Sequence, residues 1–532
     1  MILGLPGFWL ARVSFPRLPI EALALAAILP TVRIFGARLR GRLLRVFALA
    51  VLVLFTLAMA DALLDRTLGR GLDIPLDIHL APALLEFTGD ALGWRELWLW
   101  TGGALLVGVL VYAASVVALG ALAEASGATV ALCCVGAIVL TSSLGFALAA
   151  GRDGEEACLQ SLPLDCHVSQ VLARQVESAS ALWRPLPAFD RAVASDPLVE
   201  MEGELLARLR TTDVLLVFVE SYGTTVLQDP RYASTIVPRL EAIGNDLSAA
   251  GLSIASGRLE APTVGGLSWL SHGTLLSGIW LDNQRLYERL LTSDRRTLVH
   301  LFADAGHRTV GLFPQILRPW PEGAYFGYDR IWTSQNIDYV GPPFGWAVMP
   351  DQYTLWFLQR QERSEAADRP PLFAEIALIS SHAPWEPVPT LLDDWRVLGR
   401  GESFIGMADS EWKGPEGWPG KAPENYARAI AYSLDSVAGF ARRFVDEDTL
   451  MIVLGDHQPA PLITGVTGDR SVPVHVVSGD PALVAPFLEW GFRESVLPDP
   501  SGAAKRMDAF RTWFVEAFSE AEPALSVSQR VE

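Results

Sequence analysis

Long apolar runs near the amino terminus constrain this chain more than any other feature of its sequence. An α-helix needs about 20 apolar residues to cross roughly 30 Å of hydrocarbon. Residues 46–64, 97–123 and 128–150 meet this requirement and are almost free of charge. A fourth run, 18–35, contains Glu21, Pro19, Pro30 and Arg33, so it is either a span, an interfacial helix or a broken hairpin. We therefore expect residues 1–150 to form a transmembrane domain.

Basic residues predict the orientation of this domain, because short loops rich in Lys and Arg stay on the cytoplasmic side. The segment 36–45 contains Arg38, Arg40, Arg42 and Arg45 and no acid, whereas 65–96 is mainly acidic. The arginine loop is therefore placed in the cytoplasm. Because the three clear spans make an odd number of crossings, we expect everything after residue 150 to lie outside the cytoplasmic membrane, whether or not 18–35 crosses it.

The remaining sequence reads as a linker over 151–210 and a catalytic domain over 211–532. Cys158 and Cys166 either form a short disulfide loop, which an extracytoplasmic location permits, or are two unpaired small residues. Hydrophobic residues make up 50% of the chain and the net charge is −18, which argues against a nucleic-acid partner. We expect no protein partner.

Strand-type apolar runs alternate with amphipathic helical stretches after residue 211, which predicts an α/β domain with a mostly parallel central sheet flanked by helices. Catalytic and ligand-binding residues of such sheets lie at the carboxyl ends of the strands. VLLVFVE ends in Glu220, TLMIVLG is followed by Asp456 and His457, and LFAEIALISS is followed by His382. Taken alone, each of these side chains is also consistent with a cap on the next helix, but together they predict a site.

Carboxylate and imidazole donors in one place suit one divalent metal ion such as Zn, Mn or Mg. Such an ion activates a hydroxyl nucleophile, which is otherwise weak. In EAPTVGGLSW, Thr263 precedes Gly265, Gly266 and a helical stretch, and glycines allow the backbone to approach an anion. Thr263 is therefore the candidate nucleophile, and Ser268 is the alternative.

These motifs resemble those of the alkaline phosphatase and sulfatase superfamily, in particular its branch of lipoteichoic acid synthases and lipid-A phosphoethanolamine transferases. The resemblance covers about residues 213–518 and includes VFVESYG, APTVGGLSW and VLGDHQP, with YFGYDRIW and FGWAVMPDQYT as further matches. It implies a catalytic Thr263 that also binds the metal together with Glu220, Asp456 and His457. It also implies substrate contacts by His382 in SSHAPWEP and by Arg318 and Trp320 in LRPWPEG.

Departures from the family pattern narrow the expected chemistry. The nucleophile motif contains no Cys-x-Pro-x-Arg or Ser-x-Pro-x-Arg, so the formylglycine of true sulfatases is not expected. No Asp-x-x-x-His follows Thr263, which favours one principal metal, and Gln458 replaces the usual glycine after Asp-His. His475 either approaches the site as a substrate contact or packs in the core. His272 and His307 are interpreted as structural.

The resulting hypothesis is a membrane-anchored phosphotransferase. It would move a phosphoglycerol or phosphoethanolamine head group from a membrane phospholipid donor to an envelope glycan acceptor through a phospho-threonine intermediate. One alternative is an extracytoplasmic phosphodiesterase or sulfatase-like hydrolase. A second is an inactive envelope scaffold that binds anionic lipid.

Overall fold

The computed structural model describes most of the chain and divides it into two compact units, residues 1–185 and 186–532. The division falls inside the segment 151–210 that was predicted as a linker, so the limits of that linker stay a prediction. The described residues are 18–19, 32, 34–68, 71–78, 94–124, 164–165, 167–181, 186–201, 203–363, 369–407, 421–465 and 468–520.

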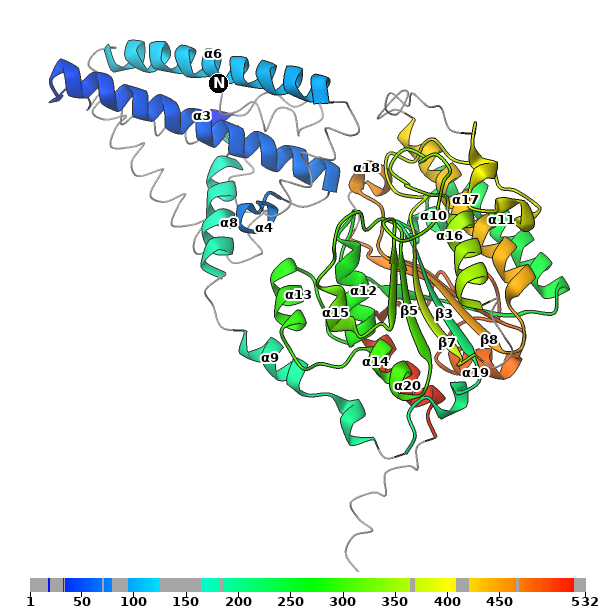
Figure 1. Ribbon diagram of the computed structural model, residues 1–532. Helices are drawn as coiled ribbons and strands as arrows, with labels where there is room; N and C mark the ends of the chain where they lie inside the picture. Colours follow the sequence, from blue (N-terminus) through cyan, green and yellow to red (C-terminus); the bar gives the residue numbers. More distant parts are fainter. Residues whose placement is uncertain are drawn as a thin grey trace, which may run out of the picture. The chain divides into compact units, whose positions relative to one another are not determined.

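The first unit contains two long apolar helices, α3 (Ala37–Leu68) and α6 (Trp94–Glu124), which pack against each other (Figure 1). By length and composition, Ala37–Leu64 and Thr101–Ala121 are candidate membrane spans. They coincide with two of the predicted runs. The predicted span 128–150, most of 18–35, and both Cys158 and Cys166 lie outside the described residues.

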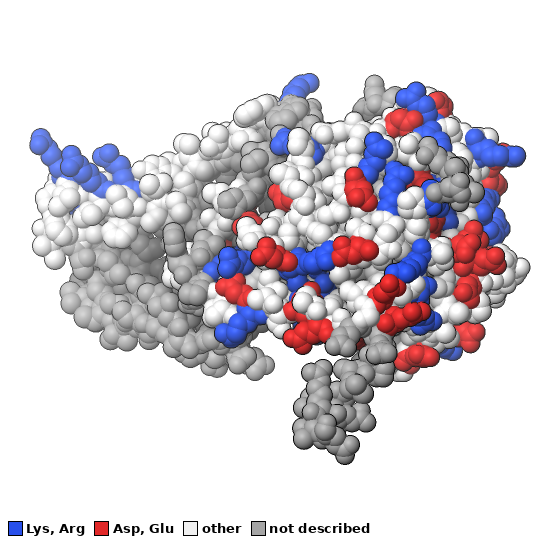
Figure 2. Space-filling view, turned by 60° about the horizontal axis from the view of Figure 1, so that its bottom comes forward, with Lys and Arg blue, Asp and Glu red and all other residues white. Residues whose placement is uncertain are grey.

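The basic segment 36–45 differs from the prediction, because almost all of it is helical. It forms the first turns of α3 rather than a loop before the span. Arg and Leu are both favourable in helices and the segment has no proline, so the helix begins well before the apolar stretch. Figure 2 shows basic side chains gathered at one end of the described part of this unit, whereas both charge signs are interspersed over the visible face of the other unit.

Part of the predicted linker belongs to the first unit. Helix α8 (His167–Ala181) packs against α3, and Arg174 forms an ion pair with Asp61 at 2.7 Å. The Asp61 side chain is buried and also accepts a hydrogen bond from the Leu72 amide. A short helix, α4 (Ile74–Asp77), and the paired strands β1 (Leu18–Pro19) and β2 (Leu164–Asp165) complete the described elements of this unit.

The second unit is built on an eight-stranded sheet with the order β10-β4-β9-β8-β3-β7-β5-β6. The prediction of a mostly parallel sheet is confirmed, with β9 as the exception, since it runs antiparallel to both β4 and β8. The strands are β3 (Asp213–Val219), β4 (Ser253–Glu260), β5 (Arg308–Phe313), β6 (Arg330–Thr333), β7 (Leu372–Leu378), β8 (Thr449–Gly455), β9 (Ser471–Ser478) and β10 (Lys505–Arg506).

Helices cover both faces of this sheet, which is why every residue of β3 is buried. Leu215, Val217 and Val219 of β3 face one apolar core, and the alternating residues Leu216 and Phe218 face the other. The first core includes side chains of α11 (Pro230–Ala249), α16 (Asp351–Leu358) and α17 (Ala422–Phe444). The second includes those of α12 (Ser268–Ser277), α14 (Leu298–Asp304), α19 (Pro481–Glu489) and α20 (Ala509–Phe518).

Shorter helices connect these elements. They are α9 (Pro187–Ala194), α10 (Thr225–Gln228), α13 (Gln284–Leu291), α15 (Gly323–Phe326) and α18 (Pro461–Thr464).

Candidate metal centre

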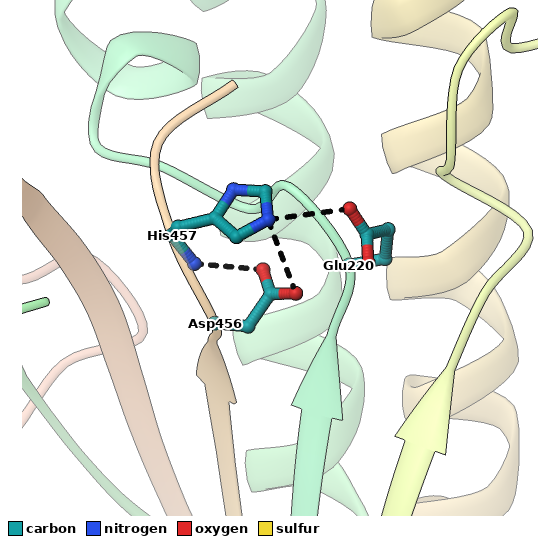
Figure 3. A group of neighbouring side chains, drawn as sticks. All are labelled: Glu220, Asp456 and His457. Atoms are coloured by element: carbon teal, nitrogen blue, oxygen red, sulfur yellow. Dashed lines mark hydrogen bonds and ion pairs between the residues drawn. The ribbon is translucent and has the colours of Figure 1, made fainter. Parts of the chain in front are cut away.

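Two neighbouring parallel strands place the predicted metal ligands side by side. Glu220 follows β3 directly, and Asp456 and His457 follow β8, whose last residue Gly455 is in register with Val219. One ligand atom from each of the three side chains lies within 4.8 Å of the others (Figure 3). Among the described residues, this is the one group of His, Cys, Asp or Glu side chains that could hold a metal ion.

The Asp456 carboxylate is oriented by backbone amides. Its Oδ1 atom accepts hydrogen bonds from the amides of Ser221 and His457, both at 2.7 Å. Ser221 has a φ of +56°, an uncommon left-handed conformation for a residue other than glycine. Both amides donate to Oδ1, whereas the other carboxylate oxygen, Oδ2, lies 3.6 Å from His457 Nε2.

The His457 ring is oriented in the same way. Its Nδ1 atom donates to the carbonyl oxygen of Gln458 at 2.9 Å, which leaves the electron pair of Nε2 free for a ligand. Nε2 lies 3.5 Å from Glu220 Oε1, and the histidine side chain is 1% exposed. A histidine held through one nitrogen, with the other facing two carboxylates, is typical of a metal ligand.

The side chain of Gln458 connects the loops that follow β3 and β8. Its side chain donates to Thr224 Oγ1 at 2.9 Å and accepts a hydrogen bond from the amide of Thr225. A Cβ atom at Gly223 would lie 1.9 Å from Gln458 Oε1, so this glycine is needed for the close approach. Through these hydrogen bonds, Gln458 holds the loop after β8 against the loop after β3.

The electrostatics of Glu220, Asp456 and His457 are those of a site suited to a cation. Burial raises the pKa of Asp456, and repulsion from Glu220 adds to it, bringing the pKa to about 6. Burial also acts to raise the pKa of Glu220, but His457 and His382 outweigh it and hold that pKa below its ordinary value. Burial opposes protonation of His457, yet both carboxylates together raise its pKa. Two carboxylates and one imidazole fit a divalent cation, which would relieve the repulsion between the acids.

Ser268, the alternative nucleophile, lies closer to this group than Thr263 does. Ser268 Oγ is 3.2 Å from Glu220 Oε2 and 3.2 Å from His457 Nε2. The hydroxyl of Thr263 instead contacts Ser271 Oγ at 3.5 Å, and within the described residues no hydrogen bond links it to the three ligands. The geometry therefore favours Ser268 over the predicted Thr263, both as nucleophile and as the hydroxyl beside the metal.

The backbone conformation between Thr263 and Ser268 explains why only Ser268 lies beside the three side chains. Thr263 lies before the turn, where the amide of Gly265 bonds to the carbonyl of Gln458. Gly265, Gly266 and Leu267 all have positive φ angles, and α12 begins only at Ser268. The glycine pair in the sequence indicated the turn correctly. The sequence signal for Ser268 is its hydroxyl at the first position of the helix, where a phosphate is favoured.

His382 lies in the loop after β7, beside the same edge of the sheet. Its ring stacks on Trp346 with a centroid distance of 5.1 Å, and its Nδ1 atom donates to the carbonyl of Ala383 at 2.6 Å. The neighbouring Ser381 donates to the backbone carbonyl of Glu220 at 2.6 Å, which anchors this loop to the end of β3. His382 also interacts electrostatically with Glu220.

The other predicted substrate contacts are not brought to the site by any described contact. Trp320 packs against Phe313 and Phe326 at centroid distances of 5.3 and 5.7 Å. Arg318 lies in the exposed part of the same loop. Neither residue is joined to the three ligands within the part of the chain that the structure describes.

His475 packs in the core, which is the second of its two interpretations. Its ring nitrogens lie 2.9 Å from the hydroxyls of Tyr222 and Ser256. Burial lowers its pKa to about 4. Because β9 is antiparallel to its neighbours and His475 lies in the middle of it, strand-end placement does not apply to this residue.

No protein-family model and no curated protein matches this chain. Among solved structures, it is similar to the lipoteichoic acid synthase LtaP from Listeria monocytogenes, with 12% identity and a TM-score of 0.35, over 51% of this chain and 66% of that one. It is also similar to a protein in the alkaline phosphatase superfamily from Vibrio parahaemolyticus, with 16% identity and a TM-score of 0.35, over 55% and 68% of the two chains. A third is the C-terminal periplasmic domain of EcEptC from Escherichia coli in complex with Zn, with 14% identity and a TM-score of 0.36, over 58% and 93%. The superfamily that the motifs resemble is thus represented among the similar structures.

Proposed function

We propose that this chain is a membrane-anchored, metal-dependent enzyme that transfers a phospho-head group from a phospholipid to an envelope glycan, with Ser268 as the nucleophile. The observation that carries the proposal is the position of Ser268 Oγ, 3.2 Å from both Glu220 Oε2 and His457 Nε2. The first turn of α12 adds a helix amino terminus, which favours a phosphate at this position.

One divalent ion held by Glu220, Asp456 and His457 would supply Lewis acidity and lower the pKa of the attacking hydroxyl. Ser268 Oγ forms a bond to phosphorus while the bond from phosphorus to the lipid alcohol breaks. The serine proton has an acceptor in Glu220 Oε2, and His382 donates a proton to the departing alkoxide. In the second half-reaction the oxygen of an acceptor hydroxyl forms a bond to phosphorus while the bond from Ser268 Oγ to phosphorus breaks; the acceptor gives its proton to His382, and Ser268 takes back the proton that Glu220 accepted.

The chemistry proposed for the transferred group is phosphoryl rather than sulfuryl, because the residue at the start of α12 is a serine with no formylglycine motif around it. The apolar helices α3 and α6 support attachment to the cytoplasmic membrane, where a lipid donor is available without leaving the bilayer. The catalytic unit would face the extracytoplasmic side with the basic first turns of α3 in the cytoplasm and the predicted span 128–150 as a third crossing after α3 and α6. The head group would be of the phosphoglycerol or phosphoethanolamine type.

The test uses the full-length protein in liposomes that contain phosphatidylglycerol or phosphatidylethanolamine, with one divalent metal added at a time. We expect diacylglycerol to be released by the wild type and by Thr263→Val, but not by Ser268→Ala. Adding a soluble glycan acceptor then distinguishes transfer from hydrolysis, because a transferase labels the glycan and a hydrolase releases the free head group. A protein that binds no metal and releases no diacylglycerol would be a scaffold, and the proposal would be wrong.

A further inference from the structure

A buried carboxylate lies in the middle of the sheet, where the proposed reaction does not use it. Glu375 of β7 is in register with Leu216 of β3 and Gly311 of β5, and it is 1% exposed. A carboxylate in an apolar core is costly unless it is fully paired. No lysine or arginine pairs with Glu375 in the described residues. Its partners are His272 Nδ1, at 2.6 Å from Oε1, and the hydroxyl of the half-buried Tyr328, which donates to Oε2.

His272 connects this carboxylate to the helix that carries the proposed nucleophile. It is the fourth residue after Ser268 on α12, so the two side chains lie on the same side of the helix, one turn apart. The His272 ring stacks on Phe218 with a centroid distance of 3.8 Å, and Phe218 lies two residues before Glu220. His272 also interacts electrostatically with Asp456. It thus contacts the strand that leads to one metal ligand and lies near a second.

The first turn of α12 needs such a contact, because its own start is not fixed by a cap. Leu267, at the N-cap position, makes no side-chain capping hydrogen bond and has a φ of +64°. It follows two glycines that also have positive φ. The start of the helix therefore contacts the end of β3 through the Ser268 hydroxyl itself, which lies 3.2 Å from Glu220 Oε2, and not through a cap. The bond between His272 and Glu375 lies one turn further along the helix.

We propose that the Glu375–His272 pair is a positioning device for Ser268, which fixes the rotation and depth of the first turn of α12 against β7 and β3. This inference rests on the proposed function and deepens it. Glu375 holds His272 through Nδ1, and Tyr328 holds Glu375 through its other oxygen. A displacement of the nucleophile by about 1 Å can cost roughly 100-fold in rate. Such a role explains a buried carboxylate that apolar packing alone does not require.

A second buried histidine gives a matched control. His307 also packs against a phenylalanine, Phe302, at a centroid distance of 4.9 Å, and its Nε2 atom bonds to the carbonyl of Thr212 at 3.2 Å. Thr212 and His307 directly precede β3 and β5, so this contact lies at the amino ends of the strands, opposite to Glu220. His307 uses a neutral carbonyl and is expected to contribute to stability alone.

The experiment measures the first-turnover burst of p-nitrophenol from bis(p-nitrophenyl) phosphate, using the full-length protein with its metal. We expect His272→Gln and Glu375→Gln each to slow the burst about 100-fold, with KM and bound metal unchanged. The double variant should be no slower than either single variant, because both residues act through one contact. His307→Gln should lower the melting temperature and leave the burst rate unchanged.

Burst rates within about twofold of the wild type in folded His272→Gln or Glu375→Gln would overturn the inference. If His272→Gln does not fold, Glu375→Gln decides, because it keeps the size of the side chain and removes its charge. A wild type that releases no p-nitrophenol, or a Ser268→Ala variant that releases it as fast as the wild type, would overturn the proposed function and this inference with it. A normal wild-type burst together with normal positioning variants would overturn this inference alone.

Discussion

The two ends of β3 hold buried carboxylates in opposite electrostatic situations. At the amino end, Asp213 accepts hydrogen bonds from Arg363 at 3.0 Å and Arg369 at 2.5 Å, as well as from the amide of Leu372. Burial would raise the pKa of Asp213, but the arginines hold it below its ordinary value. At the carboxyl end, Asp456 faces Glu220 and has a pKa of about 6.

This difference separates a structural site from a functional one. Arginine remains charged at every accessible pH, so the carboxylate at the amino end is neutralised permanently. At the carboxyl end the compensating groups among the described residues are histidines, whose charge can be lost. Such a site is suited to a divalent cation that can be removed. The same strand thus has an end that stabilises the fold and an end that is available for chemistry.

The largest expected effect distinguishes the two candidate nucleophiles at the carboxyl end. Ser268→Ala should lower the rate of diacylglycerol release by about 10³-fold or more, because it removes the attacking hydroxyl. Thr263→Val, which keeps the shape of the side chain, should retain activity within about tenfold. The measurement is lipid turnover in liposomes at saturating metal. Loss of turnover in Thr263→Val together with turnover in Ser268→Ala would show that Thr263 is the nucleophile.

The next effect concerns the metal. Asp456→Asn should abolish stoichiometric metal binding and lower turnover by at least about 100-fold, since it removes one of three protein ligands. A chelator should have the same effect on the wild type, and readdition of the metal should reverse it. Elemental analysis of purified protein measures the binding. Retention of one tightly bound ion by Asp456→Asn would show that the metal is held elsewhere.

A change at the amino end should affect stability instead. Asp213→Asn leaves two arginines without their carboxylate and should reduce the free energy of unfolding by about 3 kcal/mol, as expected when a buried ion pair is broken. Metal content and turnover of the folded protein should be unchanged. Denaturant unfolding followed by tryptophan fluorescence measures the loss. A selective loss of activity with normal stability would contradict the contrast between the two ends.

The smallest expected effect is on the pH dependence of the free energy of unfolding, and it comes from His475 in the core. His475 has a pKa of about 4 when folded, against about 6.5 when unfolded. The unfolded chain therefore binds the extra proton between these values, and stability falls as the pH falls. From pH 7 to pH 5 the expected loss is about 2 kcal/mol. His475→Gln should remove this part of the pH dependence, and an unchanged profile would show that the ring is protonated when folded.

Local patterns predicted the central strands and the grouping of Glu220, Asp456 and His457, because Glu220 and the Asp456–His457 pair each directly follow a buried apolar run. They did not predict β4, whose sequence SIASGRLE is interrupted by polar residues and glycine. Nor did they predict that β9 is antiparallel, since buried strands of either direction have the same apolar composition. The choice between Thr263 and Ser268 depended on where α12 begins. The left-handed φ of Leu267 sets that point, and a leucine gives no signal for such a conformation.

Contacts between residues far apart in the chain could not be predicted from the sequence either. His272 and Glu375 are separated by 103 positions, and each taken alone is typical of ordinary helix or strand sequence. His272 was interpreted as structural for this reason. Only the packing of α12 on β3 and β7 shows that its ring joins a buried carboxylate to the helix that presents Ser268.

The most direct test of the central claim locates the covalent intermediate. The full-length protein is mixed with its metal and bis(p-nitrophenyl) phosphate, quenched with acid during the burst, digested and analysed by tandem mass spectrometry. We predict a phosphoryl adduct on Ser268 in the wild type and its loss in Ser268→Ala. An adduct on Thr263, or full turnover with no adduct on either residue, would contradict the account.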